Sequence, residues 1–208
     1  MLTSAKGIRL LTDPYEAGSY GGAVGYKKID EPTDAISISH NHADHNYISR
    51  EHDKARIIRE TGTFVFKGIT IRGVSLYHDT SRGSERGASI AFIYTIDGMN
   101  FCHLGDLGHT LSKSELAEIG PVDVLMIPVG GTFTVDAGEA GKVMESLSPS
   151  ICLPMHYKTK SVGFNLGPLE DFTTGRAKVK TINGSEAEIT KASLPQGIEI
   201  WVLKPFKL

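Results

Sequence analysis

The chain has 208 residues, of which 40% are hydrophobic and 22% charged, and its formal net charge is −2. This is ordinary globular composition, and the length suits one domain, so we assign residues 1–208 to a single domain with a sizeable core. No Lys/Arg stripe is present and the pI is about 6.4, which argues against a nucleic-acid partner. No apolar stretch approaches the length of a membrane span, and the first residues show no signal-peptide pattern, so we expect a cytoplasmic protein.

The first half of the sequence predicts strands. Residues 7–15 indicate a short strand that ends at the Asp13–Pro14 turn and leads into an irregular, glycine-rich stretch. A buried strand is expected at residues 34–39, "DAISIS". Alternating apolar residues predict four more strands, the last two joined by an Asp97–Gly98 hairpin turn: residues 61–68, 69–78, 88–96 and 99–106.

The second half alternates helices with strands. Two helices are predicted, each opened by a capping box: residues 111–120 with Ser112 and Glu115, and residues 136–147 with Asp136 and Glu139. Further strands are expected at residues 122–131, 150–157 and 197–205. Together the two halves predict an α/β sandwich of two sheets with helices outside. Both cysteines lie in apolar runs, which favours buried free thiols: Cys102 and Cys152.

The stretch "SISHNHADHN" holds four side chains of the kind that bind metals: His40, His42, Asp44 and His45. At the end of an extended strand His40 and His42 point to the same side, so they can chelate one ion. We expect Asp44 and His45 to lie on a short helix, residues 43–49, that directs them to a second position. A polar turn that happens to be rich in histidine does not explain this spacing.

An imidazole pair cannot close a tetrahedral site, so other ligands are needed. Three candidates lie at predicted strand ends: His78 in "SLYHD", Asp106 in "HLGDLGH" and His156 in "LPMHY". Taken singly, the two histidines have an ordinary reading as core or strand-end residues, and Asp106 as a turn residue. The cluster at residues 40–45 favours the reading of all three as ligands.

The ordered motifs "SHNHADHN", "YHD", "HLGDLGH" and "LPMHY" resemble the metal motifs of the metallo-β-lactamase superfamily. With "TDPY" and "PVGGTFTVDA", the pattern is similar to that of its lactonase-like and phospholipase-D-like metal-dependent hydrolases, from Leu11 to Tyr157. The resemblance implies a four-layer αββα sandwich of two mixed sheets with helices on the outer faces. It also implies two metal positions joined by one bridging carboxylate: His40, His42 and His78 for the first, Asp44, His45 and His156 for the second, and Asp106 between them.

The start of the chain departs from this pattern. Such proteins usually open with an additional strand that carries a Gly-His-small-Phe segment, whereas this sequence begins "MLTSAKGIRLL". Either that strand is absent or the sequence begins after it, so the sequence does not show which strand forms the edge of the first sheet.

The expected ligands are five imidazoles and two carboxylates, a set that suits Zn, Mn, Fe, Ni or Co rather than Mg or Ca. We therefore expect two divalent transition-metal ions, with zinc favoured. Asp44 and Asp106 offset only half of their charge, so the substrate is expected to be a small, anionic or strongly polarised molecule. The hypothesis is a metal-bridging hydroxide that attacks an ester, lactone or phosphodiester, with Asp44 orienting it and accepting its proton.

Other positions have weaker candidate roles. His109 could face the substrate as a donor or acid, or it could be a solvated loop residue. Three cations could bind an anionic group of the substrate: Lys158, Arg82 and Arg86. Gly131 and Thr132, in the loop after a predicted strand, could bind the substrate as well. The alternatives for these are surface charges and a plain strand-to-helix turn.

Three polar residues are expected to serve the structure. His103 is predicted to be a hydrogen-bonded core histidine, and His52 a solvated surface residue. Asp13 either orients a metal ligand or caps the turn before Pro14.

Other activities of the same fold fit the sequence less well. Di-iron redox relatives tend to have Glu where this chain has His42, and they need a flavin domain that is not present. Nucleases carry an additional RNA-binding arm or inserted domain, for which this chain has no room. A non-catalytic binding protein would lack ligands, whereas all seven are present. β-Lactam hydrolysis is not favoured either, because the sequence shows no secretion signal and the fold does not dictate function.

Overall fold

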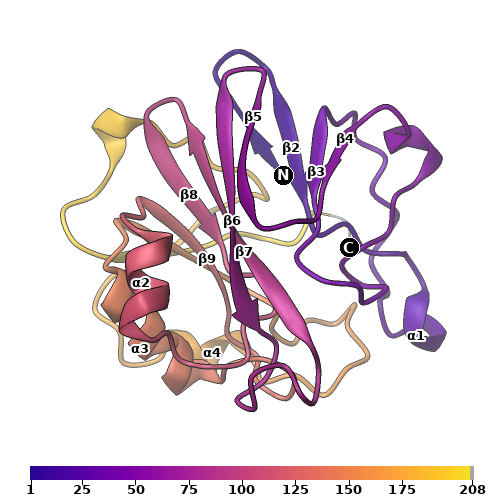
Figure 1. Cartoon of the computed structure of the whole chain (residues 1–208). Helices are drawn as coiled ribbons and strands as arrows, with labels where there is room; N and C mark the ends of the chain where they lie inside the picture. The colour runs from indigo at the N-terminus through magenta and orange to yellow at the C-terminus, as the bar shows by residue number, and fades with distance from the viewer. Residues whose placement is uncertain (207–208) are drawn as a thin grey trace.

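Two β-sheets stack face to face in the computed structural model, which describes residues 1–206 (Figure 1). The smaller sheet has four strands in the order β1 (Leu2–Thr3), β2 (Arg9–Thr12), β3 (Ala35–Ser37) and β4 (Arg56–Ile58). The larger sheet has eight, in the order β11 (Val179–Thr181), β12 (Glu199–Val202), β10 (Ile151–Met155), β9 (Val124–Pro128), β8 (Met99–His103), β7 (Ala88–Ile96), β6 (Ile69–Tyr77) and β5 (Gly62–Phe66). Both sheets are mixed: β1 pairs antiparallel with β2, and the larger sheet is antiparallel from β5 to β8 and parallel from β8 to β11.

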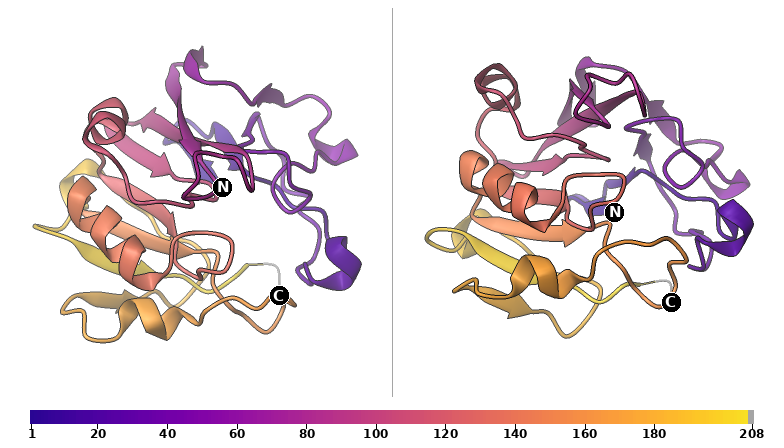
Figure 2. Two further views of the ribbon diagram at one scale, coloured as in Figure 1. Left: turned by 60° about the horizontal axis from the view of Figure 1, so that its bottom comes forward. Right: turned by 90° about the horizontal axis from the view of Figure 1, so that it is seen from below.

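The alternation of side chains along the strands builds a core on each face of the larger sheet. Phe92 and Tyr94 of β7 pack in one cluster with Leu10 of the smaller sheet. Ala91 and Ile93 alternate with these residues along β7, so they face the other side of the sheet and belong to the cluster that the helices cover. Three helices lie on this side (Figure 2): α2 (Lys113–Ile119), α3 (Ala137–Leu147) and α4 (Leu169–Thr173).

The outer face of the smaller sheet is covered by a segment with little regular structure. Leu11, Ile36 and Ile38 pack there against Ile48 and Ala55, which flank a short 3-10 helix, η1 (Arg50–His52). The other short helical elements are α1 (Ser19–Gly22) and η2 (Lys191–Ser193). The sandwich of two mixed sheets predicted from the sequence is therefore confirmed. Among the residues described, none of the helices has the length and apolar character needed to cross a membrane.

Both predicted capping boxes are present. The Ser112 hydroxyl accepts the Glu115 N–H at 3.3 Å, and the Glu115 carboxylate accepts the Ser112 N–H at 2.7 Å. Asp136 and Glu139 form the same reciprocal pair at 2.8 and 3.1 Å. Each pair satisfies amide groups that the first turn of a helix leaves unpaired, so the two helices begin where the sequence predicts.

Two predictions from the sequence are wrong. Residues 43–49 form one turn instead of a helix, because the Tyr47 N–H donates to the Pro14 carbonyl at 2.8 Å and draws the chain toward the loop after β2. His52 is buried at 2% exposure, with ring nitrogens 3.1 Å from the Ser49 hydroxyl and 3.1 Å from the Glu31 carbonyl. The two cysteines are buried free thiols, as predicted.

Candidate metal centre

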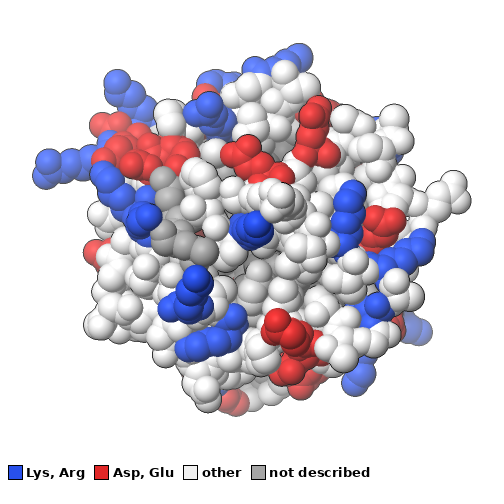
Figure 3. All heavy atoms as spheres, turned by 180° about the vertical axis from the view of Figure 1, so that it is seen from behind, with Lys and Arg blue, Asp and Glu red and all other residues white. Residues whose placement is uncertain are grey.

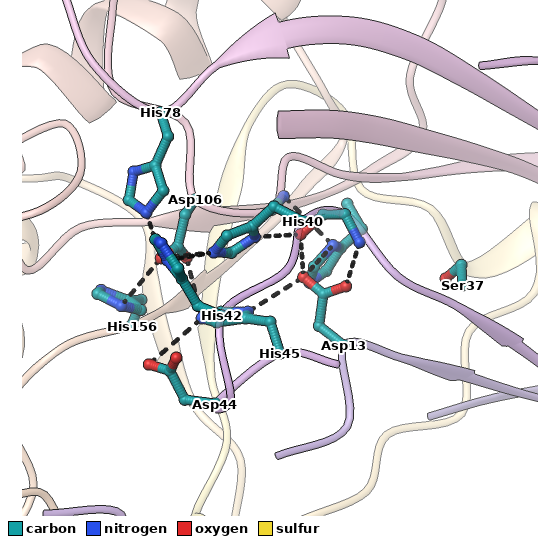
Figure 4. A network of polar contacts seen from close by, with 12 residues as sticks. Asp13, Ser37, His40, His42, Asp44, His45, His78, Asp106 and His156 are labelled. Carbon is teal, nitrogen blue, oxygen red and sulfur yellow. Dashed lines mark hydrogen bonds and ion pairs between the residues drawn. The ribbon is translucent and has the colours of Figure 1, made fainter. Parts of the chain in front are cut away.

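All seven predicted metal ligands lie just beyond the carboxyl ends of strands. His40, His42, Asp44 and His45 follow β3, His78 follows β6, Asp106 follows β8 and His156 follows β10. The strands β6, β8 and β10 run in the same direction, so their ends meet at one edge of the larger sheet. The Ile90 N–H donates to the Ser39 carbonyl at 3.0 Å, which joins the loop after β3 to this edge. The structure thus brings all seven together (Figure 4).

The Asp106 carboxylate lies at the centre of the histidines (Figure 4). Its Oδ2 is 3.3 Å from His78 Nε2, 3.6 Å from His156 Nε2 and 3.8 Å from His40 Nε2. Its Oδ1 is 3.4 Å from His45 Nε2, and among the residues described it has no hydrogen-bond partner. A buried carboxylate oxygen surrounded by ring nitrogens is suited to a cation.

The remaining ligands form two groups on either side of this carboxylate. One ligand atom from each of His40, His42 and His78 lies within 4.8 Å of the others, and the same holds for Asp44, His45 and His156. In the first group His40 Nε2 and His42 Nδ1 are 2.9 Å apart. These are the two triads that the resemblance implies.

Asp13 contacts the Nδ1 atom of His45, whereas Asp106 lies near its Nε2 atom. Its Oδ1 accepts the Ser39 N–H at 2.7 Å, while its Oδ2 accepts the Ser39 hydroxyl at 2.5 Å and lies 3.2 Å from His45 Nδ1. With Nδ1 held by Asp13, Nε2 is the atom of His45 that faces Asp106 and Asp44, at 3.4 and 3.7 Å. This geometry supports the reading of Asp13 as a residue that orients a ligand.

The buried groups perturb one another's protonation. Burial alone would raise the pKa of Asp106, but the imidazoles around it, His45 and His156 foremost, hold that pKa well below its usual range. Burial alone would lower the pKa of His45, but Asp106, Asp13 and other carboxylates outweigh it and raise that pKa. Burial and then the charge of His45 lower the pKa of His40 to about 3. The centre is therefore an ionised carboxylate beside a neutral imidazole, His40.

Two glycines let the ligand loops approach each other closely. A Cβ at Gly108 would lie 2.2 Å from the carbonyl carbon of His78. A Cβ at Gly130 would lie 2.2 Å from the carbonyl oxygen of His156, whose own φ of 52° is unusual outside glycine. The positions of both histidines therefore depend on the absence of a side chain on the neighbouring loop.

Comparison with known proteins places the chain in a family. Residues 1–156 match the model of the beta-lactamase superfamily domain. The chain belongs to the metallo-β-lactamase superfamily. A UPF0173 metal-dependent hydrolase from Carboxydothermus hydrogenoformans is 30% identical, over 89% of this chain and 93% of the relative. A second, from Thermococcus kodakarensis, is 31% identical over 73% of this chain and 78% of its own length.

A solved structure agrees with this assignment. A Thermotoga maritima protein, described as a Zn-dependent hydrolase of the metallo-β-lactamase superfamily, matches with a TM-score of 0.73 and 30% identity. The match covers 94% of this chain and 90% of that one. The protein is therefore a metal-dependent hydrolase of the superfamily, and the cluster around Asp106 contains side chains that could hold a metal ion.

The superfamily's use of metal fits the donor atoms found here. The cluster offers imidazole nitrogens and carboxylate oxygens without thiolate, the set that suits first-row transition metals. The unpaired Asp106 Oδ1 adds an acceptor that no protein group satisfies among the residues described.

A cavity of about 370 Å³ adjoins the second triad, and we call it the apolar cavity. Its wall includes Asp44, His45, Asp106 and His156 at one end, and it extends between the loop after β2 and the loop after β10. Its volume lies in the range of ligand pockets. This is the space next to the metal centre in which a substrate could bind.

The predicted substrate residues do not line the apolar cavity. The Tyr77 N–H donates to His109 Nε2 at 3.2 Å and His109 Nδ1 donates to the Thr110 carbonyl at 2.9 Å, so both ring nitrogens are used. Lys158 Nζ donates to the Val162 and Phe164 carbonyls, at 2.6 and 2.7 Å. The expected roles of His109 as an acid and Lys158 as an anion-binding group are not supported, because each braces the backbone.

The same is true of the other three predicted positions. The Gly131 N–H donates to the Val135 carbonyl at 3.2 Å, and the Thr132 hydroxyl donates to the Asn165 carbonyl at 2.6 Å. Arg82 is an exposed residue at a φ of 57° in the loop after His78. These residues shape the loops around the centre, whereas His103 is a buried histidine that accepts the Gly105 N–H at 3.2 Å, as predicted.

One residue of the site was missed from the sequence. Tyr20 lies in the glycine-rich segment, at a φ of 51°, with its ring edge-on to Phe164 at 5.4 Å. Tyr20 is 52% exposed, and the partial burial of its phenol, together with the nearby Asp44 carboxylate, raises the pKa of that group. The segment has no periodicity that would have placed Tyr20 beside Asp44, so only its aromatic character amid glycines was available as a signal.

Proposed function

We propose that the protein hydrolyses a small ester, lactone or phosphodiester with two divalent transition-metal ions, zinc favoured, and that its seven clustered His and Asp side chains hold them. The observation that carries the proposal is the position of Asp106 between two triads of ligands. In this arrangement Asp106 would help the two triads to hold the ions. The description of the Thermotoga maritima relative as Zn-dependent supports the choice of metal.

The bound ions would polarise the electrophile and lower the pKa of water toward neutrality. Asp44 lines the cavity beside the second triad, where its carboxylate would orient the attacking water and accept a proton. Tyr20, next to Asp44, would donate a hydrogen bond from its phenol. Asp13 would keep the His45 lone pair directed at the ion.

A small-molecule substrate is proposed in preference to a nucleic acid. On the face shown in Figure 3, acidic and basic side chains are interspersed and no continuous basic stripe is visible. This distribution lacks the electrostatic pattern typical of phosphate-backbone binding. A cytoplasmic location stays a prediction from the sequence.

Metal analysis by inductively coupled plasma mass spectrometry tests the proposal on wild type, Asp106→Ala and Asp53→Ala. Asp53 is an exposed carboxylate outside the cluster, so its variant controls for the loss of one acidic residue. We expect two equivalents of metal in wild type and Asp53→Ala and a loss in Asp106→Ala, together with the loss of hydrolysis of p-nitrophenyl acetate, a lactone and bis(p-nitrophenyl) phosphate. A wild-type protein that neither contains metal nor takes it up would refute the proposal.

A further inference from the structure

The wall of the apolar cavity is mainly hydrocarbon once it leaves the metal centre. The side chains there come from the loop after β2, from β10 and from the loop after β10: Val24, Pro154, Met155, Val162, Phe164 and Leu166. Such a wall favours an apolar group over a hydrated one, because burial of apolar surface is the main favourable term in binding.

Two of the tyrosines that line the cavity have hydroxyl groups already engaged with the protein. The Tyr15 hydroxyl donates to the Lys27 carbonyl at 2.6 Å, and the Tyr26 hydroxyl is 2.6 Å from the Thr159 hydroxyl. With their polar tips engaged, these tyrosines have mainly ring surface to offer the cavity. A polar substituent would therefore lose hydration without gaining these partners.

Among the described residues of the wall, one cation lies away from the metal centre. Lys204 is the one Lys or Arg in the described lining, and its Nζ donates to Asn183 Oδ1 at 2.8 Å. The charged lining residues Asp13, Asp44 and Asp106 belong to the metal centre. Apart from Lys204, the wall away from the metal centre offers no charged partner among the described residues, so a neutral group fits it better than an anionic one.

Backbone contacts join the two loops that border the cavity. Val24 and Val162 form an antiparallel bridge between the loop after β2 and the loop after β10. The Gly25 N–H donates to the Ser161 carbonyl at 2.8 Å next to this bridge. These backbone contacts hold the two loops together over the cavity, so its shape is present before a substrate binds.

We infer that the substrate carries an uncharged apolar substituent, an acyl or aryl group, that occupies the apolar cavity while the bond to be cleaved lies at the metal centre. The inference rests on the proposed hydrolytic function and adds the substrate class. The cavity volume of about 370 Å³ lies within the range of small-molecule pockets, so it has room for such a group. In an ester of this class the water oxygen joins the acyl carbon, the acyl–oxygen bond breaks, and the products are the apolar carboxylate and the alcohol.

Binding of the product carboxylates tests this class without relying on turnover. Acetate, butyrate, hexanoate and octanoate are titrated into the zinc-loaded protein by isothermal titration calorimetry. We expect Kd to fall about fourfold for each added methylene until the cavity is full, because burial of one CH₂ contributes about 0.8 kcal/mol. The kcat/KM values of the corresponding p-nitrophenyl esters should follow the same order.

Two tryptophan variants locate the binding. Val162→Trp places a large ring in the cavity wall and should flatten the dependence of Kd on chain length. Val65→Trp is the matched control, because Val65 is 67% exposed on β5, and it should keep the wild-type dependence. An unchanged dependence in a folded Val162→Trp would overturn the inference, and if that variant does not fold, the wild-type series decides alone.

The outcomes separate this inference from the proposed function. A Kd that does not fall with chain length overturns the apolar class, and hydrolysis of p-nitrophenyl acetate or bis(p-nitrophenyl) phosphate in the same sample would leave the function standing. Tighter binding of longer chains supports the class even when no ester is cleaved, in which case the failure lies with the proposed function.

Discussion

Asp13→Asn should weaken metal binding while leaving the fold intact. The wild-type carboxylate accepts both the Ser39 N–H and the Ser39 hydroxyl, and its Oδ2 faces His45 Nδ1 at 3.2 Å. Asparagine keeps one oxygen but places an NH₂ donor in the other position. An NH₂ next to Nδ1 favours the tautomer with the proton on Nε2, and Nε2 is the atom of His45 that faces Asp106.

The size of the effect on metal affinity follows from the lost contact between Asp13 and His45. A hydrogen bond to a charged group contributes about 1.5–3 kcal/mol. At about 1.4 kcal/mol for each factor of ten, this predicts a roughly 10- to 100-fold loss of metal affinity. Removal of a carboxylate that orients a metal-binding histidine typically costs about the same factor.

The assay is competition for zinc against a chelating dye, with thermal unfolding followed by circular dichroism. Asp34→Asn is the matched control, because Asp34 also accepts a backbone N–H in the smaller sheet, from Arg9 at 2.9 Å, but lies outside the ligand cluster. We expect a weaker zinc affinity in Asp13→Asn only. An unchanged affinity in that variant would refute the role given to Asp13, and equal losses in both variants would trace the effect to general stability.

Three substitutions and one thiol-labelling experiment test other features of the structure. Gly108→Ala should lower the free energy of unfolding by about 3 kcal/mol and reduce metal content, because its Cβ would meet the His78 backbone at 2.2 Å. Gly138→Ala, on a helix with its nearest neighbour at 3.4 Å, should instead raise it by about 0.5–1 kcal/mol in the same urea titration, and equal stability of the two variants would contradict the close approach. Tyr20→Phe should keep its metal but lose about tenfold or more in kcat/KM, because the phenol beside Asp44 no longer donates, and wild-type kinetics would exclude this role. Burial raises the pKa of both thiols to about 12, so a disulfide dye should label the protein only after unfolding, and stability should fall as the pH rises above 9.0, where unfolded thiols ionise first. These thiols belong to Cys102 and Cys152. Rapid labelling of the folded protein would contradict their burial.

Much of the candidate site could be predicted because its residue types and their short spacings along the chain are visible in the sequence. His40 and His42 are two residues apart, and Asp106 and His156 each follow an apolar run, so their types and their places at strand ends are visible in the sequence. The capping boxes of α2 and α3 were predictable for the same reason, since a cap and its partner are three residues apart.

The predictions that the structure does not support depended on partners distant in sequence. The sequence makes His109 a plausible acid, but the Tyr77 N–H, 32 residues away in the chain, donates a hydrogen bond to one of its ring nitrogens. His52 looked solvated, yet its ring lies against the Glu31 carbonyl, 21 residues away. Lys158 bends back onto carbonyls of its own loop, and the pattern of charges in a sequence does not show such a turn.

The sequence by itself determined the ligand types, the strands that carry them and the class of metal they suit, because these follow from side-chain chemistry and from periodicities of a few residues. Only the tertiary structure decided that Asp106 lies between two triads, that Asp13 orients His45 and that an apolar cavity adjoins the second triad. These features arise where loops from both sheets meet, and the bridge between Val24 and Val162 is one example. Contacts of that kind depend on how the whole chain packs, and no short stretch of sequence contains that information.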